Sequence, residues 1–231
     1  MPSFLTNLAS KKIILGSNSP RRQELLRGLE LDFEVRVHPI EEAIPSDLPA
    51  QYAAAYLSKL KADAFPGELQ ENELLITADT VVIDRGKVLG KPATEQEAFE
   101  MLKSLSGSTH TVMTAVTIKD RKTSITLEDE AEVTFRFLDE EEVWHYLKNY
   151  QPFDKAGSYG AQECLPARMN ACSEVELDFL KKIGKAELMD QSLNLSQEKR
   201  TVDMIEEIRG SFFNVMGFPV IEAYECIKRF S

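Results

Sequence analysis

The 231-residue sequence has few of the features that mark disulfide scaffolds, membrane proteins or nucleic-acid-binding surfaces. Its three cysteines, Cys164, Cys172 and Cys226, form no CxxC pair and no regular framework, as expected for reduced thiols in a cytosol. No apolar run is long enough to span a bilayer, and no charged-then-apolar signal opens the sequence. A net charge of −11 argues against a general nucleic-acid surface, because a polyanion requires a basic face. We therefore expect a cytoplasmic protein that binds neither membranes nor nucleic-acid polymers.

The overall amino-acid composition is that of an ordinary globular protein. Hydrophobic residues make up 43% and charged residues 28% of the chain, and the length is ample for a core. No internal repeat is visible. Strand and helix patterns alternate along the chain with several antiparallel pairs, which predicts an α/β fold around a mixed sheet. Because the whole chain is acidic, its local basic clusters indicate a small, multiply charged anion as the ligand.

The most informative stretch runs from a short apolar strand at 13–15 into a helix. Ser19 suits the N-cap of this helix and Pro20 its first position. Arg21 and Arg22 then lie in the first turn, where the helix dipole disfavours cations. A bound phosphate explains them, and so does a capped helix whose arginines face water. Under either interpretation, Arg22→Ala is expected to leave stability unchanged or slightly improved, while phosphate binding predicts weaker anion affinity.

A second informative stretch is a hairpin. The apolar strand 74–78 delivers Asp79 and Thr80, and the tight turn 84–87 reverses the chain. A two-residue loop would place Lys91 opposite Thr80, so that a carboxylate and an ammonium lie side by side. An aspartate in an apolar strand is costly unless it is paired or coordinates a cation. The pattern leaves open a structural Asp79–Lys91 ion pair and a functional carboxylate.

Several short motifs follow one another in a fixed order along the chain. They are Ser17-Asn18-Ser19-Pro20-Arg21-Arg22, Ala78-Asp79-Thr80-Val81-Val82, Gly90-Lys91-Pro92, Leu105-Ser106-Gly107 with His110, Val112–Val116, Val133–Arg136, Asp154–Gly160 and Asn214–Val220. This ordered set closely resembles the Maf family of nucleoside triphosphate pyrophosphatases, over nearly everything except about 164–200. The resemblance implies a two-lobed α/β fold, of the inosine triphosphatase-like kind, around an elongated mixed β-sheet with a cleft between the lobes. It also implies metal-dependent cleavage between the α- and β-phosphates of a nucleoside triphosphate, often by a homodimer.

The resemblance also assigns roles to single residues. Arg21, Thr80 and Gln162 stand where the dTTP/UTP-specific branch carries its specificity residues, so we expect dTTP and UTP as substrates rather than 7-methyl-GTP. Asp79 matches the proton acceptor for water. Glu42 and Asp79 would position Mg²⁺ or Mn²⁺, a hard cation suited to carboxylates and phosphate oxygens. The remaining side chains would bind phosphate oxygens, and these are Ser17, Ser19, Arg22, Lys61 and Lys91, with Arg21 beside them.

The chain departs from the family pattern in the polar segment that follows Gln162. We expect a single domain carrying an inserted, mobile helical segment at about 164–200, with weak helical patterns at 175–183 and 201–208 and a strand resuming at 212–215. The segment would act as a lid over the base pocket, as a partner surface or as padding. Its polar composition predicts that a short Gly/Ser linker in place of Cys164–Glu198 leaves the protein folded.

Two rival functions remain at this point. One is a nucleotide-sensing or division-regulating protein that does not hydrolyse its ligand, although a pure binder has no need of a base such as Asp79. The other is a Mg²⁺-dependent phosphomonoesterase, which would release orthophosphate instead of pyrophosphate. No Ser-His-Asp set is apparent among the three histidines of the chain.

Overall fold

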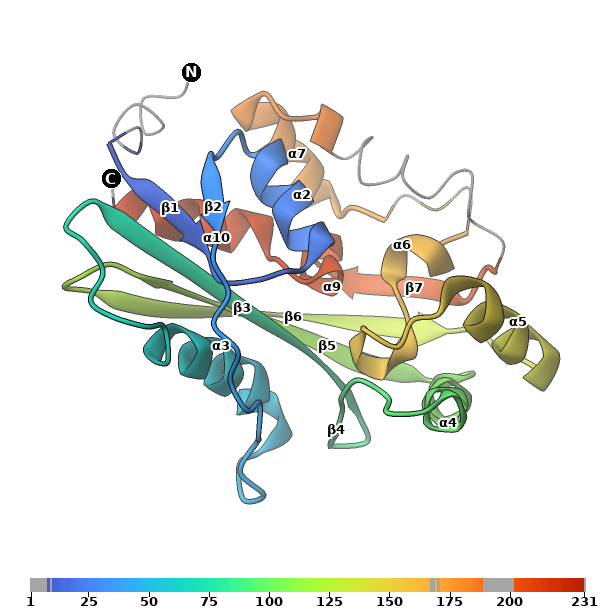
Figure 1. Ribbon diagram of the computed structural model, residues 1–231. Coiled ribbons are helices and arrows are strands. Elements are labelled where there is room, and N and C mark those ends of the chain that lie inside the picture. The colour runs from blue at the N-terminus through green and yellow to red at the C-terminus, as the bar shows by residue number, and fades with distance from the viewer. Residues whose placement is uncertain (1–7, 9, 167–168, 170, 189–201, 231) are drawn as a thin grey trace.

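The computed structural model describes residues 8, 10–166, 169, 171–188 and 202–230. In these ranges one seven-stranded mixed sheet runs in the order β2-β1-β3-β5-β6-β7, and the short β4 pairs with β3 (Figure 1). β1 is parallel to β2 and β3, and the other pairs are antiparallel. The strands are β1 (Lys12–Leu15), β2 (Phe33–Val35), β3 (Glu73–Asp84), β4 (Lys87–Leu89), β5 (Thr109–Lys119), β6 (Ser124–Phe135) and β7 (Ile205–Gly210). The elongated mixed sheet expected from the sequence is confirmed.

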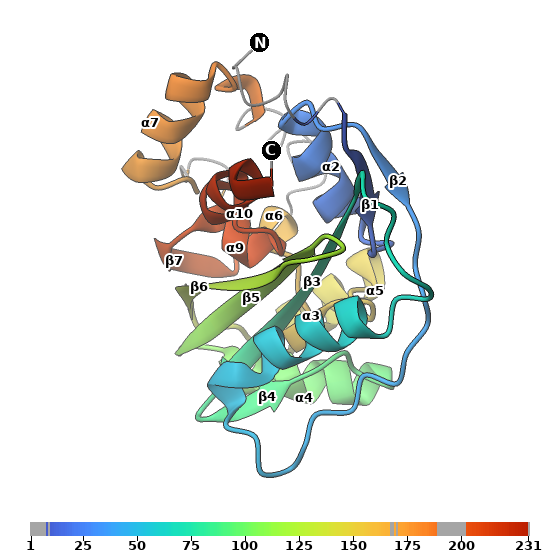
Figure 2. The ribbon, with the colours of Figure 1, turned by 90° about the vertical axis from the view of Figure 1, so that its left-hand side faces the viewer.

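Helices cover both faces of this sheet. In Figures 1 and 2, α2, α7, α9 and α10 lie on one side and α3 on the other. The α-helices are α2 (Pro20–Gly28), α3 (Ala53–Asp63), α4 (Glu95–Leu105), α5 (Glu140–Tyr150), α6 (Ala161–Cys164), α7 (Glu174–Ile183), α9 (Phe212–Met216) and α10 (Val220–Ile227). Short 3-10 turns are η1 (Ala50–Tyr52), η2 (Ala156–Ser158) and η3 (Lys228–Phe230). In the described ranges, every helix is too short or too polar to cross a bilayer.

The long central strand β3 distributes its side chains alternately to the two faces of the sheet. Val82 belongs to the main core, whereas Val81 packs in a smaller cluster with Leu57 of α3. Because side chains alternate along a strand, Asp79 shares the α3 face with Val81, and Thr80 points to the opposite face. Asp79 and Thr80 are adjacent in the sequence and yet face partners on opposite sides of the sheet.

Local signals near the N-terminal half are confirmed, and those near the C-terminal half are partly wrong. The helix predicted after Ser19 is α2. The second half of the weak helical pattern at 201–208 lies in β7, which pairs with β6. The strand predicted at 212–215 is the helix α9. Sheet pairing and burial override weak local propensity at these positions.

The segment after α6 belongs to the core, contrary to the prediction that it contributes little. Helix α7 starts with a capping box between Ser173 and Glu176. Cys172, Leu180 and Leu188 are buried in the main hydrophobic cluster. A linker in place of Cys164–Glu198 would remove these side chains from the core, so the structure favours a loss of stability over the tolerance predicted from the polar composition. Residues 189–201 lie outside the described ranges.

We expect Leu180→Ala to lower the free energy of unfolding by about 2–4 kcal/mol, because a fully buried leucine leaves a cavity. Leu180 is 1% exposed, whereas Val175 on the same helix is 70% exposed and supplies the matched control. Val175→Ala should change stability by no more than about 0.5 kcal/mol. Urea unfolding of the two variants measures both effects. Equal stability of the two variants would show that α7 is only loosely attached.

Candidate active site

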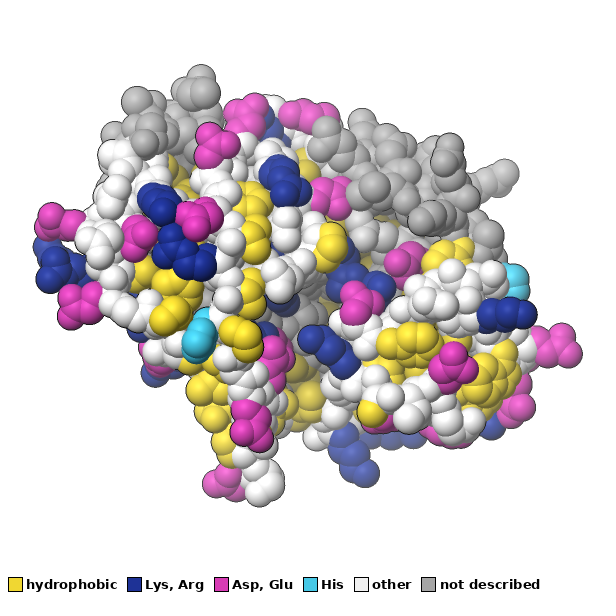
Figure 3. All heavy atoms as spheres, in the orientation of Figure 1, with side chains coloured by type: hydrophobic (Ala, Val, Ile, Leu, Met, Phe, Trp, Pro, Cys, Tyr) yellow, Lys and Arg dark blue, Asp and Glu magenta, His cyan; other side chains and the backbone are white. Residues whose placement is uncertain are grey.

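A cleft of about 670 Å³ opens beside the carboxyl end of β1 and the middle of β3. The start of α2, the loop after β2, the end of β4, the loop around η2 and the residues after α9 all contribute to its walls. Figure 3 shows the hollow with basic side chains at its rim. The lining includes five basic side chains and three carboxylates, namely Arg21, Arg22, Lys61, Lys91 and Lys155, and Glu42, Asp79 and Asp154. In a chain of net charge −11 this local excess of positive charge favours an anionic ligand.

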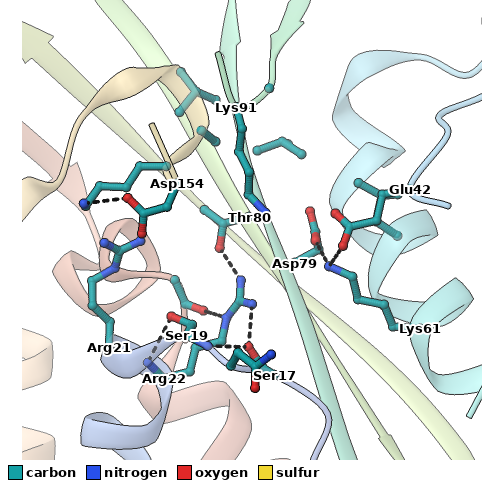
Figure 4. Close-up of a pocket in the computed structure, with 18 of the residues that line it drawn as sticks. Ser17, Ser19, Arg21, Arg22, Glu42, Lys61, Asp79, Thr80, Lys91 and Asp154 are labelled. Atoms are coloured by element: carbon teal, nitrogen blue, oxygen red, sulfur yellow. Dashed lines mark hydrogen bonds and ion pairs between the residues drawn. The ribbon is translucent and has the colours of Figure 1, made fainter. Parts of the chain in front are cut away.

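Arg22 is fixed by the protein rather than exposed to water. The hydroxyl of Ser19 caps α2 by accepting a hydrogen bond from the backbone N–H of Arg22. The Arg22 guanidinium folds back across the cleft, where Nε donates to the Gly217 carbonyl at 2.8 Å. Nη1 donates to Ser17 Oγ at 3.2 Å and Nη2 to Thr80 Oγ1 at 3.0 Å (Figure 4). The interpretation in which the arginines simply face water is therefore wrong for Arg22.

Both arginines donate hydrogen bonds to backbone carbonyls at the end of α9. Arg21 Nε donates to the Met216 carbonyl at 3.3 Å, and Figure 4 shows the Arg21 guanidinium directed toward Asp154. Gly217 has φ +103°, a conformation that favours glycine, and a Cβ there would lie 3.1 Å from Thr80 Oγ1. A glycine at this position lets Arg22 and Thr80 approach the helix end closely.

The charge of Arg22 is costly to the free protein. Burial lowers the pKa of Arg22, while the carboxylate of Asp79 raises it and the neighbouring Arg21 lowers it further. The hydrogen-bond acceptors of its guanidinium are a carbonyl and two hydroxyls, all of them neutral. A partly desolvated cation held by neutral acceptors is stabilised by an anion, and phosphate oxygens suit the guanidinium fork.

The hydroxyl of Thr80 is committed to this network. Thr114 Oγ1 donates to the Asn214 carbonyl at 2.8 Å, and a hydroxyl has one hydrogen to donate. In the 2.9 Å contact between the two threonines, Thr80 must therefore be the donor. Thr80 then accepts from Arg22 and has no hydrogen left for a ligand. Thr80 can therefore act on a ligand only as a hydrogen-bond acceptor, through its methyl group, or indirectly through the position of Arg22.

Asp79 pairs with Lys61 instead of Lys91. The ammonium of Lys61, from α3, contacts Asp79 Oδ1 and lies 3.1 Å from Glu42 Oε1. The Asp79 side chain is 10% exposed and that of Glu42 is 42% exposed. The hypothesis of a structural Asp79–Lys91 pair is wrong because Asp79 faces α3, and because β4 ends at Leu89. Lys91 still lines the cleft and extends into it (Figure 4).

The carboxylates of Glu42 and Asp79 could supply only some of the ligands that a metal ion needs. In the part of the chain that the structure describes, no group of three or more His, Cys, Asp or Glu side chains could hold a metal ion. Mg²⁺ is commonly bound by one or two carboxylates together with phosphate oxygens and water. The donor set therefore fits a hard divalent cation that arrives with a phosphorylated ligand.

The structure brings most of the predicted site residues together. The residues that line the cleft are Ser17, Ser19, Arg21, Arg22, Glu42, Lys61, Asp79, Thr80 and Lys91. Gln162 is not among them and lies in α6, shortly after the cleft residue Tyr159. Asp154 and Lys155 were not predicted as site residues, although both line the cleft and form an ion pair at 2.9 Å. A charged pair close to two glycines in a loop was the available signal.

Comparisons with known proteins show which family the chain belongs to. The family model described as "Maf-like protein" matches residues 12–175. The chain belongs to the Maf family. A "dTTP/UTP pyrophosphatase" of Porphyromonas gingivalis is 41% identical over 230 residues, covering 98% of each chain. One of Flavobacterium johnsoniae is 39% identical over 220 residues, covering 95% of each chain.

The Maf match ends inside the segment for which an insertion was predicted, whereas the relatives continue beyond it. A Parabacteroides distasonis "dTTP/UTP pyrophosphatase" is 39% identical over 228 residues, covering 98% of this chain and all of that protein. Among solved structures, the Staphylococcus aureus Ham1 protein matches 54% of this chain and 72% of its own with 13% identity and a TM-score of 0.36. A TM-score at this level supports no conclusion about this Maf-family chain.

Proposed function

We propose that this Maf-family chain hydrolyses dTTP and UTP to the nucleoside monophosphate and pyrophosphate. The observation that carries the proposal is a buried aspartate, Asp79, in a cleft lined by five basic side chains. Relatives that match nearly the whole chain bear the name dTTP/UTP pyrophosphatase. Arg21, Thr80 and Gln162 are the residues expected of that branch, and the first two line the cleft.

The protein's contribution to the reaction is electrostatic. Cleavage of a phosphoanhydride requires neutralisation of phosphate charge and an aligned water. Arg21 and Arg22 would bind phosphate oxygens from the α2 side of the cleft, and Lys91 from the β4 side. Asp79 would accept the proton of the attacking water. Lys61, which contacts Asp79 and Glu42, holds both carboxylates in place for this step.

Glu42 and Asp79 would hold Mg²⁺ or Mn²⁺ together with the nucleotide. An aspartate is a weak base, with a reference pKa of about 3.9. When bound, the cation lowers the pKa of a coordinated water, which brings proton transfer to a carboxylate within reach. The protein would supply the two carboxylates, and the phosphates of the nucleotide would supply further ligands.

A substrate screen tests this proposal. We expect kcat/KM for dTTP and UTP to exceed the values for ATP, GTP and 7-methyl-GTP by at least about tenfold, a difference of 1.4 kcal/mol in binding of the transition state. The assay separates monophosphate, pyrophosphate and orthophosphate in the presence of Mg²⁺, Mn²⁺ or EDTA. EDTA should abolish turnover. A preference for 7-methyl-GTP would remove the chain from the dTTP/UTP branch. Orthophosphate as the sole inorganic product would indicate a phosphomonoesterase. Binding of the nucleotide without turnover would indicate a sensor.

The cysteines take no part in this mechanism. All three are free and buried, and burial raises the pKa of the Cys172 thiol to about 12. Reactive cysteines are exposed and have lowered pKa values. We also propose that the protein is cytoplasmic and forms a homodimer, as expected from the sequence.

A further inference from the structure

Glu176, in the first turn of α7, is a buried carboxylate that joins two helices. The residue is 1% exposed. Its Oε2 accepts from the backbone N–H of Ser173 at 2.8 Å and from the Ser173 hydroxyl at 2.9 Å. Its Oε1 accepts from the Ser211 hydroxyl at 2.7 Å and from the backbone N–H of Phe213 at 3.1 Å. One oxygen thus caps α7, and the other fixes the start of α9.

The other end of α9 receives the arginines of the cleft. The carbonyls of Met216 and Gly217 accept from Arg21 Nε and Arg22 Nε. Helix α9 has five residues, so a shift at its start is transmitted to its end. Figure 2 shows α7 and α9 on the same side of the sheet as α2.

A second route connects α9 with Arg22 through the sheet. Asn214 in the middle of α9 donates from Nδ2 to the Val112 carbonyl at 2.9 Å and accepts from Thr114 Oγ1. Thr114 in turn holds Thr80, which accepts from Arg22. The position of α9 therefore determines two of the three acceptors of the Arg22 guanidinium.

The same segment also contacts the helix that carries the arginines. Lys185, just beyond α7, forms an ion pair with Glu30. Leu188 packs against Gly28 at the end of α2 so closely that a Cβ there would require the Leu188 side chain to move. Residues 173–188 thus contact both α2, which carries Arg21 and Arg22, and α9, whose end accepts their hydrogen bonds.

We propose that Glu176 is a positioning residue for the phosphate-binding arginines. Its carboxylate fixes α9 so that the Met216 and Gly217 carbonyls receive the two guanidinium groups. Glu176 lies just outside the Maf match at 12–175, in the segment predicted to be padding or a lid. The phosphate-binding part of this inference rests on the proposed function, and the geometric part does not.

Glu176→Gln tests the proposal, because an amide nitrogen cannot accept either of the two donors that a carboxylate oxygen accepts. Glu174→Gln is the matched control, since Glu174 is exposed in the same helical turn and loses the same charge. We expect Glu176→Gln to raise KM for dTTP and the inhibition constant of pyrophosphate by about tenfold, with a smaller change in kcat. In the free protein, hydrogen exchange of the Arg22 Nε–H, followed by NMR, should accelerate at least about tenfold. The control should stay within about twofold in all three measurements.

A lower melting temperature with wild-type Arg22 exchange and wild-type pyrophosphate inhibition would overturn the proposal and leave Glu176 as a stability residue. If Glu176→Gln does not fold, the same measurements on Ser211→Ala decide whether Glu176 positions the arginines. This substitution removes one of the four donors to the Glu176 carboxylate. If the protein hydrolyses no nucleotide, the proposed function fails, while the exchange measurement still decides whether Glu176 positions Arg22.

Discussion

Asp79→Asn is expected to lower kcat by about 10²- to 10⁴-fold, the range usually lost with a general base. The amide keeps the shape of the side chain and removes its negative charge and most of its basicity. Nucleotide should still bind, because the arginines and lysines of the cleft provide most of the phosphate contacts. Pyrophosphate release and thermal melting are measured on the same preparation.

Asp84→Asn is the matched control for this experiment. Asp84 is a second buried aspartate of β3, and it does not line the cleft. Its replacement should leave kcat within about twofold of wild type, whatever it does to stability. If Asp79 serves only as the structural partner of Lys61, we expect the opposite pattern, which is a lower melting temperature with preserved kcat. Near wild-type turnover in a well-folded Asp79→Asn protein would exclude Asp79 from the mechanism.

Arg22→Ala is expected to impair both binding and stability. Loss of a charge-assisted fork to phosphate should reduce kcat/KM by at least about 10²-fold, mainly through KM. The Gly217 carbonyl and the Thr80 hydroxyl lose their donor, which should cost about 1–3 kcal/mol and lower the melting temperature by several degrees. This reverses the sequence-based expectation of unchanged or slightly improved stability, which considered only the removal of a cation from the positive end of the helix.

Two further variants serve as controls for Arg22→Ala. Arg22→Lys keeps the charge, but one ammonium cannot replace a guanidinium that donates to three acceptors, so KM should remain raised. Arg27→Ala removes a cation from the exposed face of the same helix and should change KM by no more than about twofold. A raised KM with an unchanged melting temperature would restore the sequence-based expectation that Arg22 binds phosphate without contributing to stability. A lower melting temperature with wild-type kinetics would make Arg22 structural.

The hairpin and the start of α2 were predictable because their interactions are local. Ser19 caps a helix that Pro20 begins, through a bond that spans three residues. The turn at Arg85 and Gly86 has φ +48° and +76°, the conformation of a two-residue hairpin loop, and it places Asp84 opposite Lys87. Neighbouring residues contain all the information that these two features need.

The resemblance of ordered motifs supplied most of the site residues without their partners. Asp79 was identified in the sequence, but its ion pair with Lys61 depends on the face of β3 against which α3 packs. Asp154 and Lys155 reach the cleft because the turn at 156–158 packs against β3, where Gly157 contacts Val82. Contacts of this kind follow from the arrangement of elements and not from spacing along the chain.

The sequence by itself determined the family and the mixed sheet, and it predicted an anionic ligand and the site residues at the end of β1 and in β3. Only the tertiary structure decided the roles of the later segments. A polar sequence such as that of α7 is typical of a solvated helix, yet Glu176 is buried because Ser211 and Phe213 donate to it from α9. The short apolar run at Phe212 suits a strand or a helix equally, and burial against the sheet selected the helix. The physical reason is that backbone turns and caps are satisfied within a few residues, whereas a buried carboxylate or a desolvated guanidinium requires partners from distant parts of the chain.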